Sequence, residues 1–178
     1  TNSVITIPNN ATLNPGTGDF SISGWVKTTD DYGTILSKSR GDSQQVPEGN
    51  DWYILYLEAS RTTGLTFEMT DQYSGPNDYA LFNSTQSIAD NNFHHFLLVM
   101  NRSGNALMYI DGVLNNSIPI TEFNLDLSNN EPIEIGFDSN HLQYHFKGIL
   151  DDIAIWNRAL SPAEILSLYQ PTNQAPTA

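Results

Sequence analysis

The chain has 178 residues and no cysteine, which fits one domain whose core is large enough to fold without disulfides. Seven basic against 20 acidic residues give a net charge of -13 at pH 7. This charge disfavours nucleic acid and anionic membranes as partners and suits hard cations such as calcium, although it also serves solubility alone. No apolar run approaches the roughly 18 residues of a membrane-spanning helix.

Short segments of alternating polar and apolar residues, separated by turn residues, recur along the chain and predict an all-β protein. The run 93–100 is apolar on both faces, which predicts a central strand, and Asp111-Gly112 predicts a two-residue hairpin turn. The expected strands are 20–26, 34–37, 52–57, 65–69, 93–100, 106–110, 113–114, 133–137 and 146–156.

One helix is marked near the end of the chain. Ser161 is suited to the N-cap, Pro162 to the first helical position, and Glu164 completes a capping box. The helix is therefore expected from Pro162 to about Tyr169. Strands followed by one short helix predict a sandwich of two antiparallel sheets with a small helical lid.

The two ends of the chain suggest a module from a larger extracellular protein. Residues 1–170 are expected to form one β-sandwich, and the chain begins at Thr1 without a methionine or signal peptide. Residues 171–178 are polar and punctuated by prolines, which predicts a linker to a following domain.

Three blocks carry a family resemblance. Residues 20–26 (Phe-Ser-Ile-Ser-Gly-Trp-Val), 93–112 and 148–161 resemble, in this order, the signatures of laminin-G-like, concanavalin A-like jelly rolls. Bacterial laminin-G-like modules and pentraxins share the pattern. The resemblance implies a two-sheet jelly-roll sandwich, a fold that hosts lectins, peptide binders, glycanases and spacers.

A calcium site is the first candidate site. Residues 134–140 (Glu-Ile-Gly-Phe-Asp-Ser-Asn) resemble the pentraxin loop whose acidic side chains and one backbone carbonyl hold calcium, and the loop is expected to be exposed. Calcium takes roughly six to eight oxygen ligands. The resemblance and the nearby oxygens together give the candidate ligands Asn50, Asp51, Asp138, Ser139, Asn140 and Gln143.

The loop departs from the pentraxin pattern, since Asp138 and Asn140 replace a longer or more charged pair and so lower the ligand charge. Aspartate and asparagine are also ordinary turn formers, so the same residues are compatible with a turn that binds no metal.

A second candidate metal site involves Asp19, Asp151 and Asp152. In laminarinase-type glucanases, which the chain resembles in architecture, an aspartate of a similar closing strand binds structural calcium with carbonyls of an N-terminal loop. Only one of two adjacent strand residues faces the core side. The alternative is an aspartate that accepts hydrogen bonds from the backbone or from Arg158.

Aromatic residues near the first loop predict a sugar-binding surface, because aromatic faces stack on the apolar faces of sugars. The candidate contacts are Tyr73, Tyr79, Tyr144 and His145. His141 and His145 stand four residues apart, but no third zinc ligand accompanies them.

The sequence does not predict an enzyme, because Glu131 and Glu134 fall on opposite strand faces and no nucleophile motif is present. The leading interpretation is a calcium-dependent carbohydrate-binding module, monomeric within a longer secreted or surface protein, such as a bacterial adhesin. The alternative is a structural spacer or protein-interaction module without a glycan site.

Overall fold

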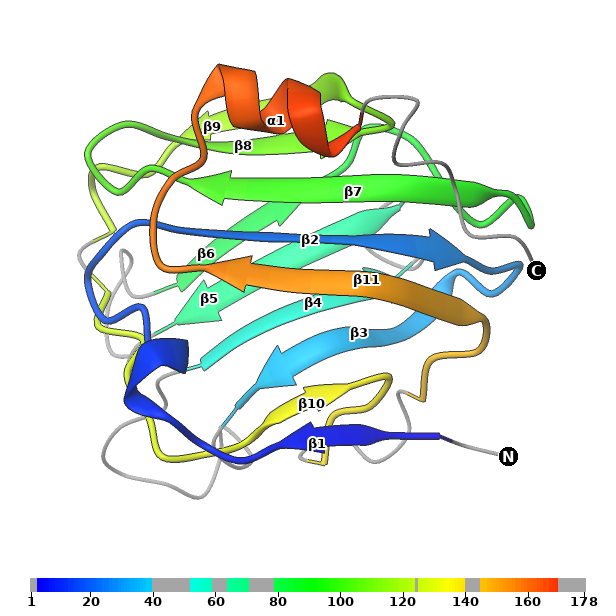
Figure 1. Cartoon of the computed structure of the whole chain (residues 1–178), viewed down its shortest axis with the longest axis horizontal. Helices are drawn as coiled ribbons and strands as arrows, with labels where there is room; N and C mark the ends of the chain where they lie inside the picture. The colour runs from blue at the N-terminus through cyan, green and yellow to red at the C-terminus, as the bar shows by residue number, and fades with distance from the viewer. Residues whose placement is uncertain are drawn as a thin grey trace.

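Two antiparallel sheets pack face to face in the computed structural model (Figure 1), which describes residues 3–39, 52–58, 64–70, 79–123, 125–139 and 145–169. In hydrogen-bonded order, the first sheet contains β1 (Ile5–Ile7), β10 (Ile133–Ile135), β3 (Tyr32–Lys38), β4 (Trp52–Glu58), β5 (Leu65–Thr70) and β6 (Tyr79–Asn83). The second contains β11 (Ile149–Trp156), β2 (Phe20–Lys27), β7 (Phe93–Met100), β8 (Asn105–Ile110) and β9 (Val113–Pro119). A 3-10 turn (Ala11–Leu13) and the helix α1 (Pro162–Leu168) complete the elements. This architecture confirms the jelly-roll prediction.

The core lies between the sheets and draws its side chains from both. Phe20 of β2 lies 5.8 Å from the ring of Tyr53 in β4 and 6.0 Å from that of Phe67 in β5, measured between ring centroids. All three side chains are buried. β7 lies between β2 and β8, as its apolar faces predicted. Every residue of β7 from His95 to Met100 is buried, because the core covers one face and other side chains cover the other.

The structure differs from the sequence prediction at several strands. The prediction missed β1 and β6, which are short edge strands of the first sheet. β10 ends at Ile135 because Gly136 adopts φ +85, a left-handed conformation that takes the chain out of the ladder. β11 begins at Ile149 and contains a bulge between Asp151 and Ala154.

The turn between β8 and β9 is the expected two-residue hairpin. Asp111 and Gly112 both have positive φ, +52 and +73, as a type I′ turn requires. The Asp111 carboxylate also accepts a hydrogen bond from the backbone N–H of His95, at 2.9 Å. The turn is therefore fixed to β7 by a side chain as well as by the ladder.

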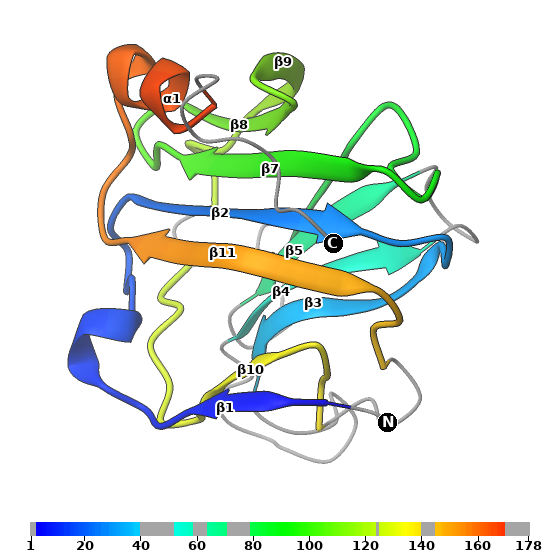
Figure 2. The ribbon, with the colours of Figure 1, turned by 45° about the vertical axis from the view of Figure 1, so that its right-hand side comes forward.

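Helix α1 covers the outer face of the second sheet, over β7 and β8 (Figure 2). Ile165 and Leu160 pack there against Leu97 and Val99 in a cluster separate from the main core. Among the described residues, α1 is the one α-helix. No helix in this part of the chain is long and apolar enough to cross a membrane.

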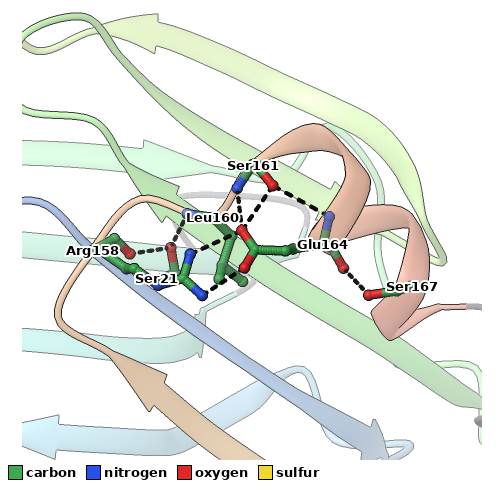
Figure 3. Close-up of polar contacts among 6 residues, drawn as sticks. All are labelled: Ser21, Arg158, Leu160, Ser161, Glu164 and Ser167. Carbon is green, nitrogen blue, oxygen red and sulfur yellow. Dashed lines mark hydrogen bonds and ion pairs between the residues drawn. The ribbon is translucent and has the colours of Figure 1, made fainter.

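The capping box predicted for α1 is confirmed (Figure 3). The Ser161 hydroxyl accepts a hydrogen bond from the N–H of Glu164, and the Glu164 carboxylate accepts one from the N–H of Ser161. The same carboxylate binds both terminal nitrogens of Arg158, at 2.8 and 2.6 Å. The buried Ser21 hydroxyl holds the segment before the helix, donating to the carbonyl of Arg158 and accepting from the N–H of Leu160.

Candidate functional site

The Asp138 loop, residues 136–139, follows β10 at the end of the first sheet. The N–H of Gly136 donates to the carbonyl of Ile35, and the carbonyl of Gly136 accepts from the N–H of Phe146. The Ser37 hydroxyl donates to the carbonyl of Phe137. These bonds connect the loop to β3 and to the segment that precedes β11, so its position is fixed by backbone on both sides.

Asp138 is fully buried, with no exposed surface. Its Oδ1 accepts a hydrogen bond from the Ser39 hydroxyl at 3.0 Å. The expectation that Asp138 lies on an exposed loop is therefore wrong: the side chain is covered, and it contacts Ser39 just after β3. Burying a carboxylate is costly unless hydrogen-bond donors or a cation compensate its charge.

Ser139 lies on the exposed side of the same loop. Its N–H donates to Glu134 Oε2 at 2.7 Å, which closes the loop back onto β10. The other predicted calcium ligands, Asn50, Asp51, Asn140 and Gln143, lie outside the described residues. Within the described part of the chain, no three histidine, aspartate or glutamate side chains gather closely enough to hold a metal. Calcium at the loop stays a prediction.

Of the four predicted sugar contacts, the structure describes the side chain of His145. It is half-buried and stacks on Phe137, with ring centroids 4.3 Å apart and planes at 13°. Its Nδ1 is buried and has no hydrogen-bond partner among the described residues. Tyr73 and Tyr144 lie outside the described residues. Tyr79 is the first residue of β6, and the structure describes its backbone but not its side chain.

The second group of predicted metal ligands is not brought together. Asp151 pairs with Trp25 across the sheet, whereas Asp19 precedes β2 and accepts a hydrogen bond from the N–H of Arg102. Six residues along β2 separate the two positions, which is about 20 Å at roughly 3.3 Å per residue.

Asp151 and Asp152 are both exposed rather than facing opposite sides of the sheet. The reason is the bulge in β11, where Asp152 has φ +49 and donates its N–H to Asp151 Oδ1 at 2.9 Å. Arg158, the alternative partner considered for this pair, binds Glu164 instead.

The outer face of the first sheet is polar, and sequence reasoning missed it. Tyr56 of β4 donates from its hydroxyl to Glu68 Oε2 of β5 at 2.6 Å. The signal was present in β5, where Thr66, Glu68 and Thr70 alternate with core residues. This polar face comprises Thr34, Ser37, Tyr56, Thr66, Glu68 and Thr70, of which Tyr56 and Glu68 are half-buried and the other four are buried.

The polar face is continuous with the Asp138 loop. Glu134 pairs with Ser37 in the ladder, and Thr34 forms an isolated bridge to His145. The Thr34 hydroxyl is buried and, like His145 Nδ1, has no hydrogen-bond partner among the described residues. Buried polar atoms are normally paired, so two such atoms on bridged residues mark a place that a polar ligand or water can fill.

Among the described side chains of the strands, the carboxylates of this outer face are those of Glu134 and Glu68. The register places them in one row, through Ser37 and Ile54. Three strand spacings of roughly 4.8 Å put their backbones about 14 Å apart. Glycosidases place their two carboxyl groups roughly 5–9.5 Å apart, a spacing that these backbones exceed.

Residues 1–166 match the family described as Concanavalin A-like lectin/glucanases superfamily. This match confirms the laminin-G-like resemblance seen in the sequence blocks. No curated protein sequence matches the chain.

Several solved structures share the fold. The binding domain of Paraclostridial Mosquitocidal Protein 1 has a TM-score of 0.72 and 20% identity, with 96% of this chain and 41% of that one covered. The binding domain of botulinum neurotoxin serotype G has a TM-score of 0.66 and 21% identity, with 94% and 40% covered. The SAP-like pentraxin from Limulus polyphemus has a TM-score of 0.61 and 16% identity, with 94% and 81% covered. The chain thus spans less than half the length of the two toxin domains.

Proposed function

The chain belongs to the Concanavalin A-like lectin/glucanases superfamily, and we propose that it is a carbohydrate-binding module that uses calcium at the Asp138 loop. The module acts within a longer secreted or cell-surface protein, as a monomeric unit. It binds without catalysing a reaction.

The observation that carries this proposal is the buried carboxylate of Asp138. Its Oδ1 accepts a hydrogen bond from the Ser39 hydroxyl, and the residue lies where the loop meets the polar face. Buried carboxylates are commonly stabilised by a cation, and calcium prefers carboxylate and carbonyl oxygens. The net charge of -13 favours cation binding in general.

The donor chemistry at this loop fits calcium. Asp138 would provide a carboxylate and Ser139 a backbone carbonyl, and the predicted partners Asn50, Asp51, Asn140 and Gln143 would add oxygens. A bound calcium ion would supply coordination positions for sugar hydroxyl groups. His145, stacked on Phe137, would orient the sugar by ring contact.

Structures that share the fold support a binding role. The binding domain of botulinum neurotoxin DC has been solved in complex with SialylT and also with rat synaptotagmin II. That neighbour is thus a binding domain for a glycan and for a protein, and this chain covers 39–40% of its length. The family includes lectins as well as glucanases, and these neighbours are binding domains, which supports a binding module.

The test compares wild type with Asp138→Asn, which keeps the side-chain shape and removes its charge. Calcium that binds only the folded protein at 100 times its Kd stabilises it by about 2.7 kcal/mol. We expect this increment in wild type and its loss in Asp138→Asn, measured by thermal unfolding with calcium and with EDTA. Binding on a glycan array should disappear with EDTA and in the variant.

Glu122→Gln is the matched control, since it removes one charge from an exposed turn. It should keep both the calcium increment and glycan binding. An increment that survives in Asp138→Asn would place the calcium elsewhere. If no glycan on the array binds and the module captures a protein partner instead, the protein-interaction module would be favoured.

A further inference from the structure

A buried lysine joins three segments at the end of β3. Lys38 has no exposed surface. Its Nζ donates to Asn129 Oδ1 at 2.8 Å, to the carbonyl of Glu131 at 2.7 Å, to Asn9 Oδ1 at 3.0 Å and to the carbonyl of Asn129 at 3.2 Å. Asn9 belongs to the β1–β2 connection, and Asn129 and Glu131 belong to the β9–β10 connection. These four acceptors are neutral oxygens, so the amine lies among amide groups.

The Asn129 side chain is held on both of its polar atoms. Its Oδ1 accepts from Lys38 Nζ and also from the N–H of Glu131, at 3.0 Å. Its Nδ2 donates to the carbonyl of Lys38 at 3.3 Å. The residue is 7% exposed, so water has little access. The N–H of Glu131 can keep its bond to Oδ1 while Nζ moves to the carbon, and such a donor stabilises the negative charge that develops on the oxygen when a nucleophile adds.

Burial also makes the amine more nucleophilic. Desolvation lowers the pKa of Lys38 to about 8, against the opposing effect of the nearby Glu131 charge. At pH 7 about one molecule in ten then carries a neutral amine, and this share rises in mild alkali. A neutral lysine amine in a water-poor site is a competent nucleophile.

We propose that Lys38 and Asn129 form an intramolecular isopeptide bond. The lone pair of Nζ attacks Asn129 Cγ, and a bond forms between Nζ and Cγ. The bond between Cγ and Nδ2 then breaks, one proton of Nζ passes to Nδ2, and ammonia leaves. No electron is gained or lost overall, and no co-reactant is needed. Asn9 positions Nζ, and the N–H of Glu131 polarises the amide carbonyl.

The bond would tie β3 to the β9–β10 connection, 91 positions apart in the sequence. A cross-link over so long a loop restricts the unfolded chain and so stabilises the fold. This modification is independent of the calcium and glycan proposal, since it uses none of the same residues.

The test is the intact mass of the denatured protein after folded incubation at pH 9. We expect a mass about 17 Da below that of the sequence, the mass of ammonia. Trypsin should fail to cleave at Lys38, and a branched peptide should contain Lys38 and Asn129. Lys147→Met, which removes an exposed lysine, is the matched control and should keep the deficit.

Two variants keep the test decisive. Lys38→Met should restore the full mass. Asn129→Asp should lose water, about 18 Da, in place of ammonia if it still forms the bond. A full wild-type mass would overturn the proposal. So would a deficit in a linear peptide cleaved at Lys38, because cyclisation of an asparagine on its own backbone also releases ammonia.

Discussion

His94 lies between two carboxylates and contacts one with each ring nitrogen. Its Nδ1 is 2.7 Å from Asp111 Oδ2 in the β8–β9 turn, and its Nε2 is 3.1 Å from Asp90 Oδ1 before β7. Burial alone would lower the pKa of His94, but the hydrogen bonds to Asp111 and Asp90 outweigh it and raise the pKa. Protonated His94 therefore links two connections that are adjacent in space.

The pH dependence of this contact has a defined sign. A raised folded-state pKa gives stability that is present below the unfolded value of about 6.5 and is lost as the pH rises through the folded value. Hydrogen bonds from Asn92 and then His94 lower the pKa of Asp90 to about 2. Asp90 therefore keeps its negative charge, and its attraction for His94, down to about that pH. The contact should therefore stabilise the protein most between about pH 4 and 6.5.

We expect His94→Gln to lower the Tm more at pH 5.5 than at pH 8.5. The difference should amount to about 1 kcal/mol, or about 2–4 °C, measured by thermal unfolding at both pH values. Burial lowers the pKa of the neighbouring His95, so His95 favours the folded protein at high pH rather than at low pH. Lys27, on the adjacent strand, lies over the Phe93 ring. Both groups are present in wild type and variant, so the comparison isolates His94. An equal loss at both pH values would contradict the assignment.

Single residues also show which features of the structure can be predicted from the sequence and which cannot. The alternation of Phe20 and Ile22 with Ser21 and Ser23 predicts which side chains enter the core, because a strand has only two faces. The burial of Asp138 could not be predicted in this way. It depends on the left-handed turn at Gly136 and on the contact with Ser39, which follows β3 and is distant in the sequence.

At the scale of the element, the cap of α1 combines local and long-range contacts. Ser161→Ala removes the hydroxyl that accepts from the N–H of Glu164, which typically costs about 1 kcal/mol. We expect the Tm to fall by about 2–4 °C in a thermal melt. Ser167→Ala is the matched control, because this exposed serine of the same helix donates only to the carbonyl of Glu164. A comparable fall in both variants would show that the cap has no special role.

The helix and the long strands were predictable because their signals are local. A capping box, a fixed proline and an apolar run such as 93–100 need no information from the rest of the chain. β1 escaped prediction because three residues are too few to show a period. The bulge in β11 escaped it because the register with β2, not the sequence of β11, reveals the additional residue.

At the scale of the whole molecule, the two sheets are joined by more than their shared core. Asn116 of β9 donates to the carbonyl of Asn83 in β6, at 2.7 Å. The N–H of Thr85 donates to Asn115 Oδ1, also at 2.7 Å. These bonds connect the edge of one sheet to the edge of the other. We therefore expect the sheets to unfold together.

Calorimetry tests this expectation. A single transition, with equal calorimetric and van't Hoff enthalpies, is the expected result. Far-UV circular dichroism and tryptophan fluorescence should follow the same curve, since tryptophans lie in both sheets, at positions 25, 52 and 156. Two resolved transitions would show that the sheets are separate cooperative units.

The strand order also sets when the protein can fold during its synthesis. β2 pairs with β7 on one side and with β11 on the other (Figure 1). One edge of β3 can pair only after β10 has been synthesised. A ribosome adds roughly 5–20 residues each second, so strand edges of early segments stay unpaired for several seconds until residues 133–156 emerge. Nascent chains of this module are therefore exposed to edge-to-edge association for most of their translation. Chaperone demand should be greatest just before β11 leaves the exit tunnel.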